Sequence, residues 1–214
     1  MKQLVIVGAG SFAREVAWLV EEMNKVEPEW EFLGFADDSV TGETIEGYNV
    51  LCSVKELGRL SPRPMLVCAI GNPTTRKKIV EPLEEQGYQF ATLVHPSVIM
   101  SRYVQIGHGS IICAGTILTT SVHIGNHCIL NLNCKVGHDT RLGDYASLMP
   151  ATNLAGNVTV GEGCYFGLNS AVINDLSIGE WSVIGAGAVV VKDIPPRVVA
   201  VGVPARPTRD NLES

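Results

Sequence analysis

The chain has 214 residues, a formal net charge of −6 at pH 7 and 46% hydrophobic residues. This size and composition predict a globular protein of one large domain or two small ones. The acidic balance, without any basic run, argues against nucleic acid as the main partner. The N-terminus does not read as a signal peptide and no apolar run approaches about 18 residues, so we expect no membrane insertion and a cytoplasmic location.

Six cysteines are present, and none of them forms a CxxC pair. Three of them, Cys128, Cys134 and Cys164, share one position of a repeat described below. Small buried thiols in a reducing compartment explain this usage better than disulfides or a cysteine metal site.

The first segment reads as a small Rossmann-like α/β domain over residues 1–93. Residues 2–8 form a short apolar strand, a glycine turn follows, and apolar residues at helical spacing begin at Phe12. Further strands are predicted over residues 32–36, 65–70 and 88–94, and a second helix over about 74–86. Backbone N–H groups at the start of the first helix favour a phosphate. The turn alone is a weak signal, since any α/β unit needs one.

Polar residues follow the second and third predicted strands of this domain. Asp37 and Asp38 end the second strand, where a carboxylate accepts hydrogen bonds from a ribose or a base. Gly71 and Asn72 follow the third strand, and Arg76 lies in the first turn of the second helix. Only about ninety residues are available, half of a full dinucleotide-binding domain. We therefore expect the binding of one nucleotide rather than an oxidoreductase.

The segment from Val94 to Val190 has a repeat of six residues. A period of six fits neither a helix nor a strand, and it is the hexapeptide pattern of a parallel β-helix with three short strands per 18-residue coil. A chance origin has a probability on the order of 10⁻⁵ for seventeen consecutive apolar positions. These positions are Val94, Met100, Ile106, Ile112, Leu118, Ile124, Leu130, Val136, Leu142, Leu148, Leu154, Val160, Phe166, Val172, Ile178, Ile184 and Val190.

Two further positions of the repeat support this interpretation. A small or β-branched residue stands four places after nearly every apolar one, and Leu176 is the exception. Glycine follows the apolar residue at five sites that are eighteen apart, which predicts one column of turns with unusual backbone angles; these are Gly107, Gly125, Gly143, Gly161 and Gly179. Pro195 and Pro196 end the coils, so we place the β-helix at residues 94–194 and a tail at 195–214.

The chemistry of the β-helix is predicted at His138. It stands two places after an interior position, so it faces outward near a corner, and Asp139 is beside it. An imidazole next to a carboxylate is suited to general-base catalysis. Gly156 lies eighteen residues further, about 4.8 Å away along the axis, where a thioester carbonyl could approach its N–H as an oxyanion donor.

The other histidines are predicted to be surface or turn residues; these are His95, His108, His123 and His127. β-Helices of the carbonic anhydrase kind bind zinc through three histidines. No matching set is recognisable, although His108, His123 and His127 stay open for that role. We expect no metal.

The small α/β domain, the Gly137-His138-Asp139 and Leu154-Ala155-Gly156 segments and the Gly202-Val203-Pro204-Ala205-Arg206 tail resemble the bacterial hexapeptide-repeat sugar acetyltransferases. That family includes nucleotide-4-aminosugar N-acetyltransferases and sialic acid O-acetyltransferases. The resemblance implies a left-handed β-helix, although general chirality rules favour right-handed crossovers. It also implies a homotrimer with active sites between neighbouring subunits and acetyl-CoA as the co-substrate.

The resemblance also assigns roles to residues. His138 is the base, Asp139 orients it and Gly156 supplies the oxyanion N–H. Residues that would hold a nucleotide sugar are Gly8, Gly10, Ser11, Asp37, Asp38, Gly71, Asn72, Arg76 and Asn131. Residues that would lie along acetyl-CoA are Gly167, Leu168, Gly185, Ala186, Lys192 and Arg206. Cys134 is interior by its position in the repeat, so transfer is expected to be direct.

Two departures from the family pattern affect the acceptor. Many members have histidines where this chain has Phe12 and Ser147. The favoured acceptor is the amine of a nucleotide-linked 4-aminosugar. The alternatives are a sugar hydroxyl, an inactive trimeric nucleotide-binding scaffold and a zinc hydratase.

Overall fold

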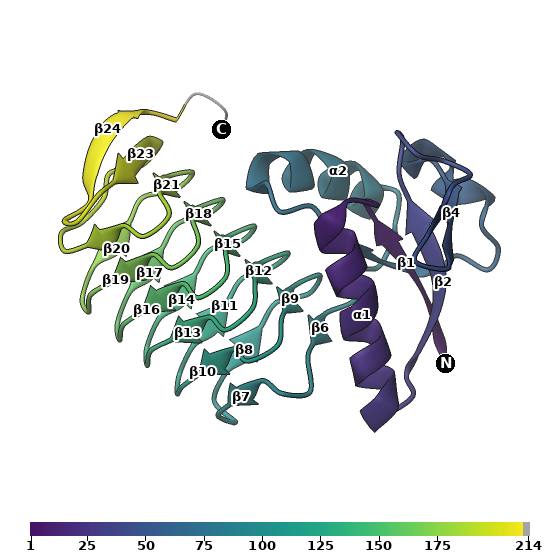
Figure 1. Cartoon of the computed structure of the whole chain (residues 1–214), viewed down its shortest axis with the longest axis horizontal. Coiled ribbons are helices and arrows are strands. Elements are labelled where there is room, and N and C mark those ends of the chain that lie inside the picture. The colour runs from purple at the N-terminus through teal and green to yellow at the C-terminus, as the bar shows by residue number, and fades with distance from the viewer. Residues whose placement is uncertain (212–214) are drawn as a thin grey trace.

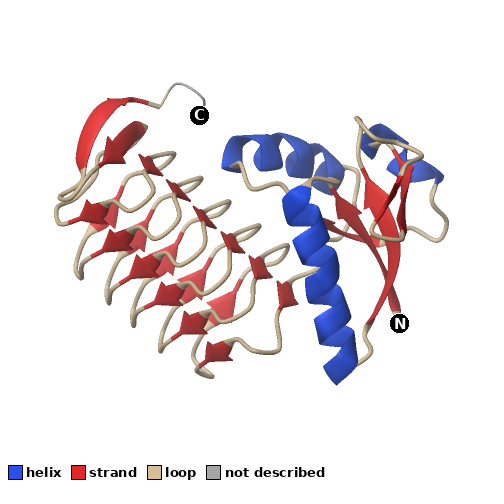
Figure 2. Ribbon diagram, viewed as in Figure 1, coloured by secondary structure: helices blue, strands red, loops and turns tan. Residues whose placement is uncertain are grey.

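The computed structural model describes residues 1–211 as a small α/β domain followed by a left-handed parallel β-helix (Figures 1 and 2). The α/β domain has one sheet in the order β3-β4-β2-β1-β5, with β1 completely buried from Leu4 to Val7. Its strands are β1 (Lys2–Val7), β2 (Trp30–Ala36), β3 (Thr44–Ile45), β4 (Tyr48–Cys52) and β5 (Met65–Cys68). Its helices are α1 (Ser11–Val26), η1 (Val54–Arg59) and α2 (Pro73–Glu85).

The predicted strands and helices of this domain are present, with one error. Residues 88–94 do not form a strand of the domain. Phe90 makes only an isolated bridge to Leu66, and β6 (Leu93–Val94) instead pairs with β9 of the β-helix. Tyr88 and Phe90 are buried because they pack in the apolar cluster beneath α2. The β3–β4 hairpin was not predicted, because its strands are short and enclose a polar Glu46-Gly47 turn.

The β-helix has three faces made of two-residue parallel strands. The first face contains β6, β9 (Ile111–Ile112), β12 (Ile129–Leu130), β15 (Ser147–Leu148), β18 (Tyr165–Phe166) and β21 (Val183–Ile184). The second face contains β7 (Ile99–Met100), β10 (Ile117–Leu118), β13 (Lys135–Val136), β16 (Asn153–Leu154), β19 (Ala171–Val172) and β22 (Val189–Val190). The third face contains β8 (Gln105–Ile106), β11 (His123–Ile124), β14 (Arg141–Leu142), β17 (Thr159–Val160) and β20 (Ser177–Ile178).

We call the edge between the first and second faces the first corner, that between the second and third faces the second corner, and that between the third and first faces the third corner. The sixfold pattern predicts the interior correctly. Each predicted interior residue from Ile112 to Val190 is at most 4% exposed. The first three positions are less buried: Val94 and Ile106 are half-buried, and Met100 is 47% exposed because its strand β7 ends the second face and has no strand on its other side.

The glycine column lies at the third corner, but its physical reason differs from the prediction. These five glycines do not have positive φ; instead, a Cβ there would meet the backbone of the next coil, as at Gly143, where it would be 2.6 Å from the nitrogen of Glu162. The left-handed residues stand two positions further on and include His127, Tyr145 and Trp181. Glycine is therefore needed for close stacking of the coils, not for its backbone freedom.

The two parts are joined along the first face and the third corner. Residues of α1 and β1 share an apolar cluster with Ile111 and Ile129, the outward residues of β9 and β12. At the other end, the tail folds into a hairpin of β23 (Val198–Val201) and β24 (Arg206–Asp210), and β23 extends the first face. In residues 1–211 no helix is both long and apolar enough to cross a membrane.

Candidate active site

His138 and Asp139 project from the second corner. The Nδ1 of His138 lies 2.9 Å from Oδ2 of Asp139, and both side chains are about three-fifths exposed. Asp139 has a φ of 60°, a left-handed conformation that aspartate tolerates. When the protonated Nδ1 donates to the carboxylate, the lone pair of Nε2 is free to accept a proton.

The imidazole of His138 lies against Gly156 of the next coil. A Cβ on Gly156 would be 2.4 Å from Nε2 of His138, so only glycine leaves room for the ring in this position. A backbone hydrogen bond also holds the two coils together here, since the N–H of Asn157, next to Gly156, donates to the carbonyl of His138 at 2.7 Å. The structure thus places His138 and Gly156 together, as the eighteen-residue spacing predicts.

The residues predicted to lie along acetyl-CoA divide between two corners. Lys192 is exposed on the second corner, three coils beyond His138, which corresponds to about 14 Å along the axis. The glycine pair Gly167 and Gly185 is at the first corner, on the opposite edge of the second face, beside the exposed Leu168 and Ala186. Arg206 is exposed at the start of β24. Within one chain, the predicted cofactor residues therefore do not form one continuous site.

The glycine turn after β1 lies between the ends of β2 and β5. Gly8 has a φ of 100°, and the N–H of Ala9 donates to Oδ2 of Asp37 at 2.9 Å. A Cβ on Gly8 would meet the side chain of Ile70 at 3.3 Å, so the loop after β5 adjoins this turn. The three loops meet at the carboxyl ends of parallel strands, where open α/β sheets bind ligands.

Several predicted substrate residues also hold these loops in place. Asp38 accepts a hydrogen bond from the N–H of Val54 at 2.8 Å, and Asn72 caps α2 by accepting one from the N–H of Thr75 at 2.9 Å. Gly10 and Ser11 are exposed at the start of α1. Asn131 is 6% exposed at the first corner, where its Oδ1 accepts from the N–H of Leu132.

Arg76 was predicted as a substrate contact, and the structure gives it a different role. Its side chain is only 1% exposed, because α2 packs its buried face onto the third corner. Burial lowers the pKa of the guanidinium to about 10, so it remains charged near neutral pH. Its five N–H groups are matched by the carbonyls of Ile70, Gly71, His127 and Tyr145 and the hydroxyl of Ser147, at 2.6 to 3.1 Å. Arg76 therefore joins the two parts of the chain and has no donor left for a ligand.

Ser147 completes this junction. Its hydroxyl donates to the carbonyl of Gly71 at 2.9 Å while it accepts from Arg76. The serine that replaces a histidine of the family thus fixes the loop beside the predicted acceptor site. Phe12, the other replacement, is half-buried against the cluster shared by α1 and the first face.

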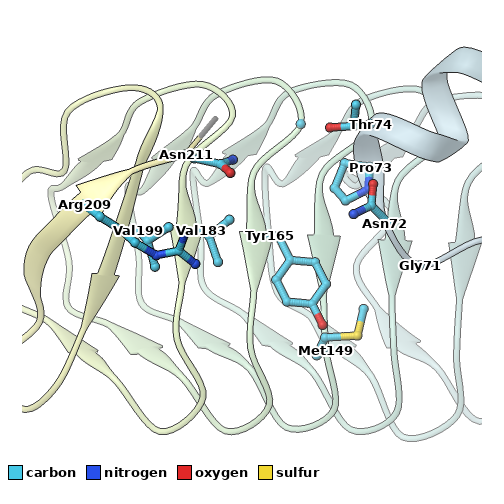
Figure 3. A pocket seen from close by; sticks show the side chains of 11 residues that line it. Gly71, Asn72, Pro73, Thr74, Met149, Tyr165, Val183, Val199, Arg209 and Asn211 are labelled. Carbon is cyan, nitrogen blue, oxygen red and sulfur yellow. The ribbon is translucent and has the colours of Figure 1, made fainter. Parts of the chain in front are cut away.

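A cavity of about 380 Å³ lies over the first face, between the start of α2 and the C-terminal hairpin (Figure 3). Gly71 and Asn72 line one end, and Arg209 lines the other. Tyr165 and Met149 lie between them. The N-terminus of a helix and an arginine both favour an anionic group, and the apolar floor favours a sugar or a carbon chain.

The cavity was missed at the sequence level, although one signal was available. Tyr165 and Val183 occupy the position just before an interior residue on the first face, eighteen residues apart, and so point outward. Arg209 lies in β24, beyond the predicted tail motif. Its position depends on the hairpin, which the hexad pattern does not describe.

The cysteines agree with their predicted environment, and the histidines agree only in part. All six cysteines are free and buried, and burial raises the pKa of Cys134 to about 12, consistent with an interior thiol rather than a nucleophile. Among the histidines expected at surface or turn positions, His127 is a turn residue, although only 2% exposed, and the expectation was wrong for His95, which is 9% exposed and outside a turn. They are covered by elements outside the β-helix: His127 lies against Phe90, and His95 packs against Trp18 of α1.

Residues 3–83 match the family model of the PglD N-terminal domain. GDP-perosamine N-acetyltransferase of Escherichia coli O157:H7 is 32% identical over 198 residues, which cover 92% of this chain and 81% of that protein.

Solved structures agree over nearly the whole length. A histidine-to-asparagine mutant of perosamine N-acetyltransferase from Caulobacter crescentus, in complex with CoA and GDP-perosamine, is 32% identical with a TM-score of 0.92 and covers 98% of each chain. The acetyltransferase domain of PglB from Neisseria gonorrhoeae, in complex with acetyl coenzyme A, is 29% identical with a TM-score of 0.89 and covers 97% of this chain and 99% of that one.

Proposed function

Because the chain belongs to the bacterial nucleotide-aminosugar acetyltransferases, we propose that it transfers acetyl from acetyl-CoA to the amine of a nucleotide-linked 4-aminosugar, with His138 as the general base. Relatives named GDP-perosamine N-acetyltransferase and UDP-N-acetylbacillosamine N-acetyltransferase, and a solved relative with CoA and GDP-perosamine, support acetyl-CoA-dependent N-acetylation of a nucleotide aminosugar. The observation that carries the assignment to His138 is its contact with Asp139 on one side and Gly156 on the other.

The acceptor is proposed to bind where the three loops of the α/β domain meet the cavity. Asp37 and the N–H groups around Gly10 would hold the nucleotide, and the sugar would extend past Asn72 toward Tyr165. The positive end of α2 and the side chain of Arg209 suit the diphosphate of such an acceptor.

Acetyl-CoA is proposed to lie along the second face, with its thioester at His138. The N–H of Gly156 has no acceptor among residues 1–211, so it is available to the thioester carbonyl oxygen. Lys192, in the same column, would meet the phosphates at the far end of the pantetheine arm. At the first corner, Gly167 and Gly185 have no side chains, so their backbone groups would be open to acetyl-CoA bound by a neighbouring subunit.

In the proposed reaction, the free amine of the sugar attacks the thioester carbon, so a C–N bond forms and the C–S bond breaks. Nε2 of His138 accepts the proton that the amine loses and returns it to the departing CoA thiolate. Asp139 holds the ring in the required tautomer. Gly156 stabilises the negative charge that develops on the carbonyl oxygen.

We also propose a homotrimer in which one subunit supplies the His138 corner and its neighbour supplies the cavity. His138 lies at the second corner, whereas the cavity lies over the first face of the same chain. Exposed apolar side chains near these edges, such as Leu168 and Ile173, are available for such contacts. Light scattering should give three times the 22.9 kDa chain mass, and a fully active monomer would contradict the shared site.

The acceptor is tested by thiol release from acetyl-CoA with matched pairs of nucleotide sugars that carry an amine or a hydroxyl at C4. GDP-linked and UDP-linked forms should both be included, with the product mass recorded. Release with the amine alone, and a product heavier by one acetyl group, is expected. Release with hydroxyl acceptors alone would favour O-acetylation, and silence in protein that binds no CoA would favour an inactive scaffold.

A further inference from the structure

A second cluster of ligating side chains lies at the third corner, away from His138. Glu84 of α2 meets His108 and His127, which stand at the corner on neighbouring coils. One carboxylate oxygen of Glu84 is 2.7 Å from Nε2 of His108 and 2.9 Å from Nε2 of His127. All three atoms lie within 4.8 Å of one another.

The backbone and the packing fix this convergence. The N–H of His127 donates to the carbonyl of His108 at 2.8 Å, so the two residues are held on adjacent coils. Their rings are nearly perpendicular, with centroids 4.8 Å apart, which lets both Nε2 atoms point to one place. His127 is stacked on Tyr145, and its carbonyl accepts from Arg76.

We propose that Glu84, His108 and His127 form a binding site for a divalent transition metal of the zinc class. Two imidazoles and one carboxylate are ligands that Zn²⁺ prefers, whereas Mg²⁺ and Ca²⁺ prefer oxygen alone. This assignment departs from the expectation that the protein has no metal.

The site can reach metal geometry with small movements. Ligands about 2.1 Å from a tetrahedral zinc are about 3.4 Å from one another, so the two short contacts to Glu84 must widen by about 0.5 to 0.7 Å. His108 is 52% exposed and Glu84 is 34% exposed, so both have room to move while the buried His127 stays in place. A solvent-facing cavity lined by Glu84 and His108 leaves the fourth position open.

A metal at this position would have a structural effect. Glu84 belongs to the α/β domain and both histidines belong to the β-helix, so the ion would tie the end of α2 to the third corner. The other polar attachments of α2 to the corner are Arg76 and Lys77, about two turns earlier in the helix, and Lys77 donates to Glu162 at 2.5 Å. Bound metal should therefore raise the thermal stability of the junction without entering the acetyl-transfer reaction.

The test uses tag-free, chelator-treated full-length protein with Zn²⁺ and, separately, Co²⁺. We expect one equivalent of Zn²⁺ by calorimetry, a rise in Tm that saturates with it, and a Co²⁺ absorption spectrum of four- or five-coordinate geometry. Glu84→Gln and His108→Asn should each weaken Zn²⁺ binding by about 100-fold or more. Glu85→Gln, which removes the same charge from the neighbouring exposed position, should leave binding unchanged.

Two results would overturn the proposal. One is the absence of saturable Zn²⁺ binding and of any Tm shift, which would reduce the cluster to a carboxylate hydrogen-bonded to two imidazoles. The other is binding that Glu84→Gln and His108→Asn leave intact, which would place the metal elsewhere. Both substituted side chains are partly exposed, and retention of the metal-free Tm verifies that the variants fold.

Discussion

Arg76 at the junction is buried, whereas His138 at the second corner is exposed. This difference indicates a structural role for Arg76 and supports the catalytic role proposed for His138. Arg76 at the junction is 1% exposed, and each of its donors meets a protein acceptor. His138 at the second corner is about three-fifths exposed and uses one ring nitrogen on Asp139. A saturated buried cation has nothing left to offer a ligand, whereas the exposed imidazole keeps one nitrogen for a proton.

This contrast also explains why both residues looked functional in the sequence. Each is a basic side chain beside a glycine loop, and a pattern of residue types does not reveal the number of acceptors around it. Substitutions at the junction should therefore reduce mainly stability, and substitutions at the second corner should reduce mainly catalysis.

The largest expected effect on stability comes from Arg76→Met. The substitution leaves the buried carbonyls of His127 and Tyr145 without donors, so we expect a loss of about 3–5 kcal/mol in the free energy of unfolding. Urea denaturation measures this loss. The control is Arg141→Met, at an exposed position on the third face, which should change it by less than about 0.5 kcal/mol. Equal effects of the two variants would refute the junction role.

Gly156→Ala should damage catalysis with little effect on folding. The new methyl group would be 2.4 Å from Nε2 of His138, so the exposed ring must turn away. We expect kcat to fall by about 100-fold, as for a catalytic group displaced by about 1 Å. The control is Gly58→Ala, where the nearest atom is 4.0 Å away. Unchanged kcat in Gly156→Ala would show that the ring position does not matter.

Asp139→Asn should have a smaller effect on the same reaction. Asparagine tolerates the left-handed backbone at this position but loses the charge that orients and supports the imidazole. We expect kcat to fall by about tenfold, equivalent to about 1.4 kcal/mol, while KM for acetyl-CoA is kept. A rise in KM at constant kcat would instead assign Asp139 to acetyl-CoA binding.

The smallest effect is expected for Ser147→Ala at the junction. It removes one of the five acceptors of Arg76 and the donor to Gly71, and Arg76 keeps its four carbonyl partners. We expect a loss of about 1 kcal/mol in the free energy of unfolding, again by urea denaturation. A loss as large as that of Arg76→Met would mean that the hydroxyl, not the carbonyls, holds the guanidinium.

The sequence predicted the β-helix better than the rest because its pattern is local. Every sixth residue from Ile112 to Val190 is interior, so each coil specifies its own register. The same arithmetic correctly placed Gly156 beside His138. It misjudged the reason for the glycine column, since the collision at Gly143 involves the backbone nitrogen of Glu162, nineteen residues away.

What the sequence could not reveal depends on contacts between distant elements. Arg76 bonds to Tyr145, 69 residues away, and no repeat relates α2 to that corner. The cluster at Glu84 was missed for the same reason, because His108 and His127 are nineteen residues apart and only the docking of α2 brings the carboxylate to them. The cavity likewise needs the C-terminal hairpin, which lies outside the hexads.

The measurement that tests the account most directly is thiol release from acetyl-CoA by His138→Ala, with the aminosugar acceptor that the wild type uses and at equal concentrations of folded protein. Turnover is expected to fall by about 10²- to 10⁴-fold, and the free energy of unfolding should not change because the side chain is exposed. Near-normal turnover in this variant would contradict the account and move the reaction away from the second corner.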